Sequence, residues 1–262
     1  MVNIRMVFFD IDGTLYDQRK KVPESTVKAI ALLQRQGIAT AIATGRAPFM
    51  FAALRAQLGI DSYVSFNGSY TVFRGEPIVR TPIARPMLEM LAEEAGEHAQ
   101  RLVFQDERTM ASDGPLEAPA VDGLASLHLN LPLPAVDRHF YQTHDVYQAL
   151  LFYDAHADID YLRREPLNRL DYVRWHPQAV DVIPGGGSKA VGIQHLLNKL
   201  GLTADQICAF GDGNNDVEML RLAGIGVAMG NGVAPAKQAA DYITRSADED
   251  GIYHGLRAIG LI

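Results

Sequence analysis

Two aspartates separated by one residue, Asp10 and Asp12, directly follow a compact apolar run at residues 6–9. Carboxylates this close repel each other, and placing both in one small site is costly unless a cation lies between them. Mg²⁺ suits such a site because it binds one or two carboxylates together with phosphate oxygens and water. The pair therefore favours magnesium-assisted chemistry on a phosphate, although an Asp-Gly loop with solvated carboxylates explains the same residues equally well.

A second polar cluster, Thr44-Gly45-Arg46, follows another apolar run. The hydroxyl group of Thr44 and a backbone N–H group nearby can hold phosphate oxygens. Taken alone, however, Thr44 is better explained as a helix N-cap ahead of Pro48.

Two further clusters come from the C-terminal third of the chain. Lys189 follows three glycines and begins an expected helix, where its charge adds to an already positive helix terminus unless an anion is bound. A solvated surface lysine is the alternative. Residues 211–216 read Gly-Asp-Gly-Asn-Asn-Asp, again after an apolar run. Either Asp212 or Asp216 would suffice to cap the following helix, so the presence of both favours a second role.

The apolar runs that precede these clusters show no alternation, which is typical of strands buried on both faces of a parallel sheet. They lie at residues 6–9, 41–43, 63–64 and 207–210. Helical patterns separate them, at about 27–37, 48–58 and 189–200. This alternation predicts an α/β fold with a doubly wound parallel sheet, in which a ligand lies beyond the carboxyl ends of the strands.

The middle third of the chain, residues 81–184, has more aromatic strands and none of the glycine-rich strand ends. We expect helices near 87–95 and 159–164, and strands near 102–104, 127–129, 146–153, 172–175 and 180–183. The pattern predicts an inserted α+β domain. The remaining residues, 1–80 and 185–262, would then form one discontinuous core domain.

Composition excludes several classes of partner. The 262 residues carry a net charge of -7, which argues against a surface for nucleic acid or an anionic membrane. The single cysteine, Cys208, permits no intrachain disulfide, and no window approaches the ~20 apolar residues of a membrane span. We therefore expect a cytoplasmic protein. Its oligomeric state does not follow from the sequence.

The four clusters resemble, in order, the four motifs of the haloacid dehalogenase-like superfamily. The similarity is closest to the Cof-type phosphatases, in which the Gly-Asp-Gly-x-Asn-Asp motif is followed by a Met-Leu helix, as at residues 211–220 here. The long insertion between Thr44 and Lys189 has the same position as in that group. The resemblance covers residues 1–80 and 185–262 and implies a Rossmann-like core with an inserted α+β cap that acts as a lid.

The resemblance also implies roles for the acidic residues. Asp10 would be the nucleophile that forms an aspartyl phosphate, and Asp12 would serve as general acid and then general base. The Asp10 carboxylate, the Asp12 backbone carbonyl and Asp212 would bind Mg²⁺, with Asp216 behind them.

Other motif residues would bind the transferring phosphoryl group: Thr44, Gly45 and Lys189 directly, with Asn215 orienting Lys189 or the phosphate. We expect a phosphatase that hydrolyses a small soluble phosphate monoester, with sugar phosphates favoured by the habit of the family. A phosphomutase of the same superfamily is the nearest alternative. A phosphate-binding or regulatory module with a decayed site is an alternative from another class.

Overall fold

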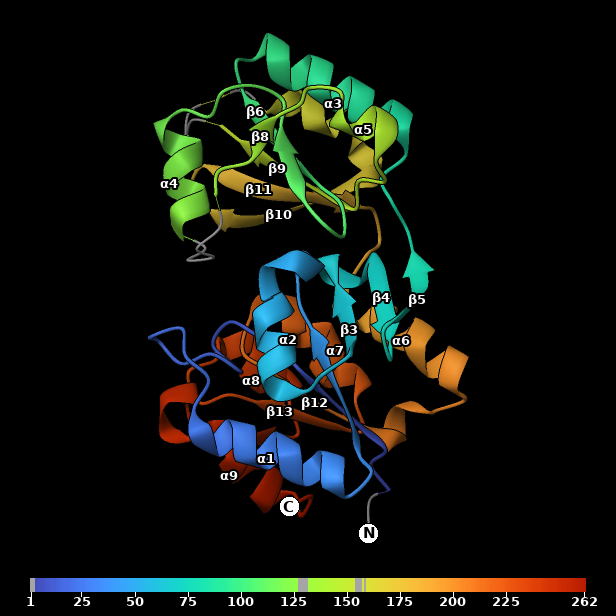
Figure 1. The fold of residues 1–262 in the computed structure, drawn as a ribbon, viewed down its shortest axis with the longest axis vertical. Helices are drawn as coiled ribbons and strands as arrows, with labels where there is room; N and C mark the ends of the chain where they lie inside the picture. The colour runs from blue at the N-terminus through green and yellow to red at the C-terminus, as the bar shows by residue number, and fades with distance from the viewer. Residues whose placement is uncertain (1–2, 127–131, 154–156, 158) are drawn as a thin grey trace. The chain divides into compact units, whose positions relative to one another are not determined.

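The computed structural model describes residues 3–126, 132–153, 157 and 159–262. The chain forms two compact units, which we describe separately (Figure 1). The first unit consists of Met1–Arg46, Ala52–Val79 and Ser188–Ile262. The second unit consists of Ala47–Phe51 and Arg80–Gly187.

An eight-stranded sheet in the order β14-β13-β12-β1-β2-β3-β4-β5 forms the centre of the first unit. Its strands are β1 (Met6–Phe9), β2 (Ala39–Ala43), β3 (Ser62–Ser65), β4 (Tyr70–Phe73), β5 (Glu76–Arg80), β12 (Ile207–Gly211), β13 (Ile225–Ala228) and β14 (Tyr242–Ile243). The pairs from β14 to β3 are parallel, and β4 pairs antiparallel with β3. The prediction of a doubly wound parallel α/β sheet is therefore confirmed.

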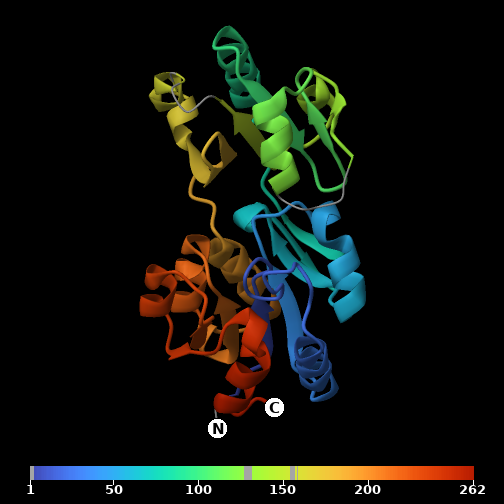
Figure 2. The ribbon, with the colours of Figure 1, turned by 90° about the vertical axis from the view of Figure 1, so that its left-hand side faces the viewer.

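Helices cover both faces of this sheet. They are α1 (Glu24–Arg35), α2 (Ala52–Leu58), α6 (Lys189–Leu200), α7 (Val217–Leu222), α8 (Ala234–Ala239) and α9 (Gly251–Ala258). Apolar side chains of α6, α7 and α8 share one core with Met6, Phe8 and Ala41 of the sheet. The other face carries α1 and α2 (Figure 2). Because β1 is covered on both sides, its four residues are all buried, as the unbroken apolar run requires.

The parallel register brings three strand ends to one edge of the sheet. Phe9 at the end of β1 lies opposite Phe210 of β12 and Ile42 of β2. The polar residues that follow these three strands, beginning with Asp10, Thr44 and Asp212, therefore leave the sheet side by side.

The second unit contains a six-stranded sheet in the order β10-β11-β9-β6-β7-β8. Its elements are α3 (Arg85–Glu97), β6 (Arg101–Gln105), β7 (Met110–Ser112), α4 (Ala118–Ser126), β8 (Ala135–Val136), α5 (Phe140–Thr143), β9 (Gln148–Phe152), β10 (Leu170–His176) and β11 (Ala179–Pro184). Most of its strand pairs are antiparallel, whereas β7 and β8 are parallel.

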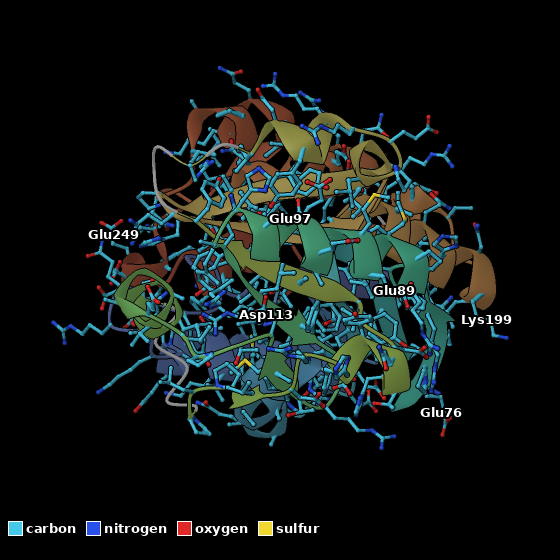
Figure 3. The ribbon with its side chains drawn as sticks, turned by 90° about the horizontal axis from the view of Figure 1, so that it is seen from above. Glu76, Glu89, Glu97, Asp113, Lys199 and Glu249 are labelled. Carbon is cyan, nitrogen blue, oxygen red and sulfur yellow. The ribbon has the colours of Figure 1, made fainter. Side chains whose placement is uncertain are left out.

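Helix α3 shows how the second unit builds its core. Leu88, Leu91 and Ala95 recur at helical spacing and are buried against the sheet. Glu89 and Glu97 lie on the exposed side of the same helix (Figure 3). Residues of α4 pack in a separate cluster with Val103, Leu150 and Phe152. Because Val103 and Leu150 alternate along their strands with residues of the α3 core, α4 covers the opposite face of the sheet.

Several local expectations differ from the structure. The helix expected near 159–164 is only a 3₁₀ turn at Asp160–Arg163, because Pro166 disfavours helical backbone at the residue before it. The strand expected near 127–129 lies outside the described residues. The strands β4 and β5 and the helix α4 were not expected, since short or alanine-rich segments carry little periodicity.

Two glycines near the end of β11, Gly185 and Gly186, suit their positions for different physical reasons. A Cβ atom on Gly185 would lie 2.0 Å from the backbone oxygen of Arg169, so this position requires glycine for close packing. Gly186 has φ +75 and open space around it, so here the backbone conformation favours glycine.

Within the described part of the chain no helix is both long and apolar enough to cross a membrane.

Candidate active site

The loop after β1 places Asp10 at the edge of the sheet. Its backbone N–H donates to the carbonyl oxygen of Phe210 at 3.0 Å, and its side chain is buried. Gly13 turns the chain with φ +81, and a Cβ atom there would lie 2.3 Å from Oδ2 of Asp212. Only glycine therefore lets this loop approach the loop after β12 so closely.

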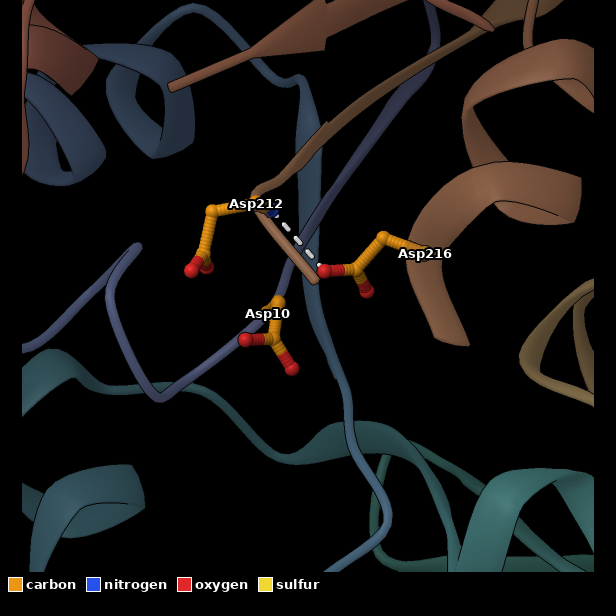
Figure 4. A group of neighbouring side chains, drawn as sticks. All are labelled: Asp10, Asp212 and Asp216. Carbon is orange, nitrogen blue, oxygen red and sulfur yellow. Dashed lines mark hydrogen bonds between the residues drawn. The ribbon is translucent and has the colours of Figure 1, made fainter. Parts of the chain in front are cut away.

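Three carboxylates meet at this edge. Asp10, Asp212 and Asp216 each contribute an oxygen that lies within 4.8 Å of the other two (Figure 4). Oδ2 of Asp216 accepts hydrogen bonds from the backbone N–H groups of Asp212 at 2.9 Å and Gly213 at 2.8 Å. The hydroxyl group of Thr14 donates to Oδ1 of Asp212 at 2.7 Å. These hydrogen bonds hold the carboxylates in place despite their mutual repulsion.

Lys189 supplies the positive charge within this cluster. Its Nζ atom lies 2.5 Å from Oδ1 of Asp10 and 2.6 Å from Oδ1 of Asp216. The side chain is 1% exposed, so the alternative of a solvated surface lysine is wrong. Helix α6 begins at Lys189, and the Ser188 hydroxyl caps it by accepting the backbone N–H of Val191.

The cluster carries more negative than positive charge. Three carboxylates and one ammonium group sum to a charge of -2 (-3 + 1) when all are ionised. Burial, and then repulsion from Asp216, raises the pKa of Asp10 well above its usual value. Burial likewise raises the pKa of Asp212 to about 6. Burial alone would lower the pKa of Lys189, but Asp10 and Asp216 outweigh it and raise that pKa. A divalent cation would balance the charge, and the oxygen-only donor set fits Mg²⁺.

Asp12 lies outside this carboxylate cluster and is held by two cations. Its carboxylate pairs with Nε and Nη2 of Arg46, both at 2.7 Å, and with Nζ of Lys20 at 2.8 Å. Burial would raise the pKa of Asp12, but the hydrogen bonds and charges of Arg46 and Lys20 lower it overall. Asp12 is therefore a stabilised carboxylate in this conformation.

The residues expected to hold phosphate line a neighbouring part of the edge. Thr44 is buried, and its hydroxyl group accepts the backbone N–H of Arg46 at 3.1 Å. A Cβ atom on Gly45 would lie 3.0 Å from the amide of Asn67. Asn215 donates to that same amide at 3.3 Å, so the partner of its side chain here is Asn67 and not Lys189.

Sequence reasoning missed some residues that shape the site. Arg46 belongs to the Thr44-Gly45-Arg46 motif, but no role was predicted for its side chain. Lys20 was not among the predicted site residues. Asn231 was also missed; its side chain donates to the backbone oxygen of Gly13 at 2.8 Å and accepts the backbone N–H of Ala247 at 2.9 Å. The third position of the Thr-Gly-Arg motif offered a signal for Arg46. Lys20 belongs to the loop after β1 itself, and only the fold brings Asn231 to that loop.

Comparison of the sequence with known proteins finds a matching family and similar proteins of nearly the same length. Residues 7–256 match the sequence profile of the haloacid dehalogenase-like hydrolases. The chain is 39% identical over 258 residues to the putative phosphatase YkrA of Bacillus subtilis, covering 98% of each protein.

Solved structures of other proteins match the fold of this chain over nearly its whole length. A hypothetical protein from Geobacillus kaustophilus HTA426 is 46% identical with a TM-score of 0.93, over 99% of this chain and all of that one. The sugar phosphatase BT4131, of haloacid dehalogenase subclass IIB, is 31% identical with a TM-score of 0.84, over 98% of this chain and 100% of that one.

Proposed function

Because this chain belongs to the haloacid dehalogenase-like hydrolases and is a phosphatase of that family, we propose that it hydrolyses a small soluble phosphate monoester with Mg²⁺, through an aspartyl phosphate on Asp10. The observation that supports this proposal best is the buried meeting of Asp10, Asp212 and Asp216 with Lys189. A structural salt bridge would need one carboxylate for one lysine. The surplus negative charge is explained if a divalent cation binds here, and that cation would also attract a substrate phosphate.

In the first step, an Asp10 carboxylate oxygen would attack phosphorus, and the bond between phosphorus and the ester oxygen would break. Mg²⁺, held by Asp10, the Asp12 carbonyl and Asp212, would offset the negative charge of the carboxylates and the phosphate. Lys189, Thr44 and Gly45 would bind the phosphoryl oxygens, because charge stabilisation and positioning dominate phosphoryl transfer. Asp216 keeps Lys189 in place through the 2.6 Å contact.

Asp12 would transfer the protons. It would donate a proton to the leaving alkoxide, then accept one from the water that attacks the phosphoenzyme, which regenerates the Asp10 carboxylate. Arg46 and Lys20 stabilise the ionised form of Asp12, so the proton-donating form requires Asp12 to leave Arg46. We infer that Arg46 holds Asp12 between turnovers.

The second unit would act as a cap that selects the substrate. The residues of the first unit described above account for metal, phosphate and nucleophile, and none of them is suited to recognise the alcohol part of an ester. Recognition would then fall to the unit formed mainly by Arg80–Gly187. Cytoplasmic location stays a prediction from the single cysteine.

The direct test is hydrolysis of p-nitrophenyl phosphate by the purified protein. We expect slow turnover with Mg²⁺ and none after EDTA treatment, with recovery when Mg²⁺ is returned. The Asp10→Asn variant should show no turnover while it remains folded, because it keeps the shape of the side chain and removes the nucleophile. Full activity in EDTA would contradict the metal assignment, and an active Asp10→Asn variant would contradict the nucleophile.

A further inference from the structure

The segment between β13 and α8 contacts both loops that carry the carboxylates of the site. The backbone N–H of Val233 donates to the carbonyl oxygen of Asp212 at 2.9 Å. A Cβ atom on Gly232 would lie 3.2 Å from Cα of Asp212, so the two backbones pack closely. The side chain of Asn231 donates to the carbonyl oxygen of Gly13 at 2.8 Å. This segment therefore joins the loop after β12 to the loop after β1.

The side-chain amide of Asn231 is itself held in one orientation. Its Oδ1 atom accepts the backbone N–H of Ala247 at 2.9 Å. Ala247 is buried and begins a 3₁₀ turn, in which the Ser246 hydroxyl group donates to the Glu249 carboxylate at 2.6 Å. Because one partner of the amide is a backbone donor and the other a backbone acceptor, only one placement of its oxygen and nitrogen satisfies both.

The loop after β1 leaves one backbone oxygen free. The backbone oxygens of Asp10, Ile11 and Gly13 each accept a hydrogen bond. The backbone oxygen of Asp12 lies between them in the chain and accepts none from the residues that the structure describes. A free carbonyl oxygen at this position can bind a cation, which is the part that the proposed mechanism gives it.

The direction of this free oxygen depends on Gly13. The peptide group that contains the Asp12 oxygen and the one that contains the Gly13 oxygen meet at the Cα atom of Gly13. Glycine populates many backbone conformations, so Gly13 alone does not fix the angle between the two groups. The hydrogen bond from Asn231 fixes the second peptide group and thereby limits rotation of the first.

We propose that Asn231 is a positioning residue that holds the Asp12 carbonyl and Asp212 at the spacing that Mg²⁺ requires. Mg²⁺ demands a near-ideal octahedron at short distances, whereas Ca²⁺ accepts longer and more variable ones. Loss of the Asn231 amide should therefore weaken binding of Mg²⁺ or Mn²⁺, which also suits octahedral oxygen sites, more than binding of Ca²⁺. This inference rests on the proposed function, in which the two positioned groups bind the metal.

The competing explanation is that Asn231 only stabilises the turn that begins at Ala247. Removing the amide would then lower the stability of the protein and leave the metal affinities of the folded protein unchanged. Metal binding measured without substrate separates the two explanations, because it does not depend on the rate of any chemical step.

The experiment uses the full chain, unaltered and as Asn231→Leu, which keeps the branched shape of the side chain and removes both hydrogen bonds. Mn²⁺ binding is measured by electron paramagnetic resonance and Ca²⁺ binding by calorimetry. The rate on p-nitrophenyl phosphate is measured as a function of Mg²⁺ concentration. Asn198→Leu, at an exposed position of α6, is the matched control for a lost amide in the same unit.

We expect Asn231→Leu to raise the Kd of Mn²⁺ about tenfold or more, the usual cost of losing a group that orients a metal ligand. The Kd of Ca²⁺ should rise less. The Mg²⁺ concentration that gives half the maximal rate should rise by a factor similar to that for Mn²⁺, and kcat at saturating Mg²⁺ should stay near that of the unaltered protein. Asn198→Leu should change none of these values. Asn231→Ala decides the question if Asn231→Leu does not fold.

Two results would overturn the inference: an unchanged Kd of Mn²⁺ in a folded Asn231 variant, or equal losses of Mn²⁺ and Ca²⁺ affinity. The Asp212→Asn variant separates this failure from that of the proposed function. If Asp212→Asn binds Mn²⁺ as well as the unaltered protein does, the metal site itself is wrongly assigned, and the proposed function fails together with this inference.

Discussion

Asp10 and Asp12 are two residues apart but lie in opposite electrostatic environments. Asp10 is buried among other carboxylates, which raises its pKa, whereas Arg46 and Lys20 lower the pKa of Asp12. Pairs of carboxyl groups whose surroundings move their pKa values apart are typical of sites that give each group a different task. In the proposed mechanism, a bound cation would favour the ionised form of Asp10, and Asp12 would act as an acid after it separates from Arg46.

The first prediction concerns the task of Asp12. Asp12→Asn should lower kcat/KM on an alkyl or sugar phosphate by about 10²–10⁴, the usual contribution of a general acid and base. The loss should be smaller for p-nitrophenyl phosphate, because its phenolate leaves without a proton. Steady-state kinetics on both substrates check this. Asp205→Asn, at an exposed position of the same unit, should change neither. Equal losses on the two substrates would argue against proton donation by Asp12.

The second prediction concerns pH and Asp181. The pKa of its carboxyl group rises from a usual 3.8 to about 8 on folding, so the folded state holds a proton that the unfolded state has released. Stability from this group is present below pH 3.8 and is lost as pH rises through about 8. Relative to Asp181→Asn, the unaltered protein should therefore lose on the order of 1–3 kcal/mol over that range, a discounted figure because the residue keeps some contact with solvent.

Urea unfolding of both proteins at several pH values measures this difference. A difference in unfolding free energy that stays constant from acidic to alkaline pH would contradict burial of the Asp181 carboxyl group.

At the scale of elements, the start of α6 is seated on the turn after β3 through two glycines. Gly68 has φ +104, and a Cβ atom there would lie 2.2 Å from the backbone oxygen of Ser188. A Cβ atom on Gly192 would lie 2.8 Å from Cα of Gly68. Because α6 begins at Lys189, this contact fixes the position of the lysine that joins Asp10 to Asp216.

The third prediction follows from that contact. Gly68→Ala should destabilise the protein by about 2–4 kcal/mol, through backbone strain and overpacking. It should also lower kcat at least about tenfold, because small displacements of a catalytic group are costly. Gly96→Ala, in α3 with open space around it, should instead stabilise by about 0.5–1 kcal/mol. Thermal melts and kinetics of the two variants provide the comparison. Normal activity in folded Gly68→Ala would show that Lys189 does not depend on this packing.

The elements that position the site were predictable because their signals are local. Unbroken apolar runs marked β1 and β12, and three glycines followed by Lys189 marked the start of α6. The partners of Asp12 were not predictable. Lys20, with φ +57, lies in the same loop as Asp12 and reaches it through the fold of that loop, whereas Arg46 follows β2 and reaches Asp12 through the register of the sheet. The 3₁₀ turn at Asp160–Arg163 was missed because a short helical pattern does not distinguish one turn from a helix.

At the scale of the whole molecule, the longer of the two segments in the second unit begins after Val79 and ends before Ser188. We propose that the second unit closes over the first when Asp10 is phosphorylated, which would exclude water and strengthen the electrostatics of the site.

The fourth prediction tests this closure. Beryllium fluoride with Mg²⁺, which mimics a phosphorylated aspartate, should reduce the radius of gyration measured by X-ray scattering. Asp10→Asn under the same conditions is the control and should show no reduction. A radius of gyration unchanged by beryllium fluoride, in protein shown to bind it, would mean that the cap is fixed.

The central claim, covalent catalysis by Asp10, is tested most directly by trapping the intermediate. The Asp12→Asn variant, in which hydrolysis of the phosphoenzyme should be slowed, is mixed with substrate and Mg²⁺, quenched and reduced with borohydride, which converts an aspartyl phosphate to homoserine. Peptide mass spectrometry should then find homoserine at position 10, and none when EDTA is present. Release of phosphate with Asp10 unmodified, or with the modification on another residue, would contradict the account.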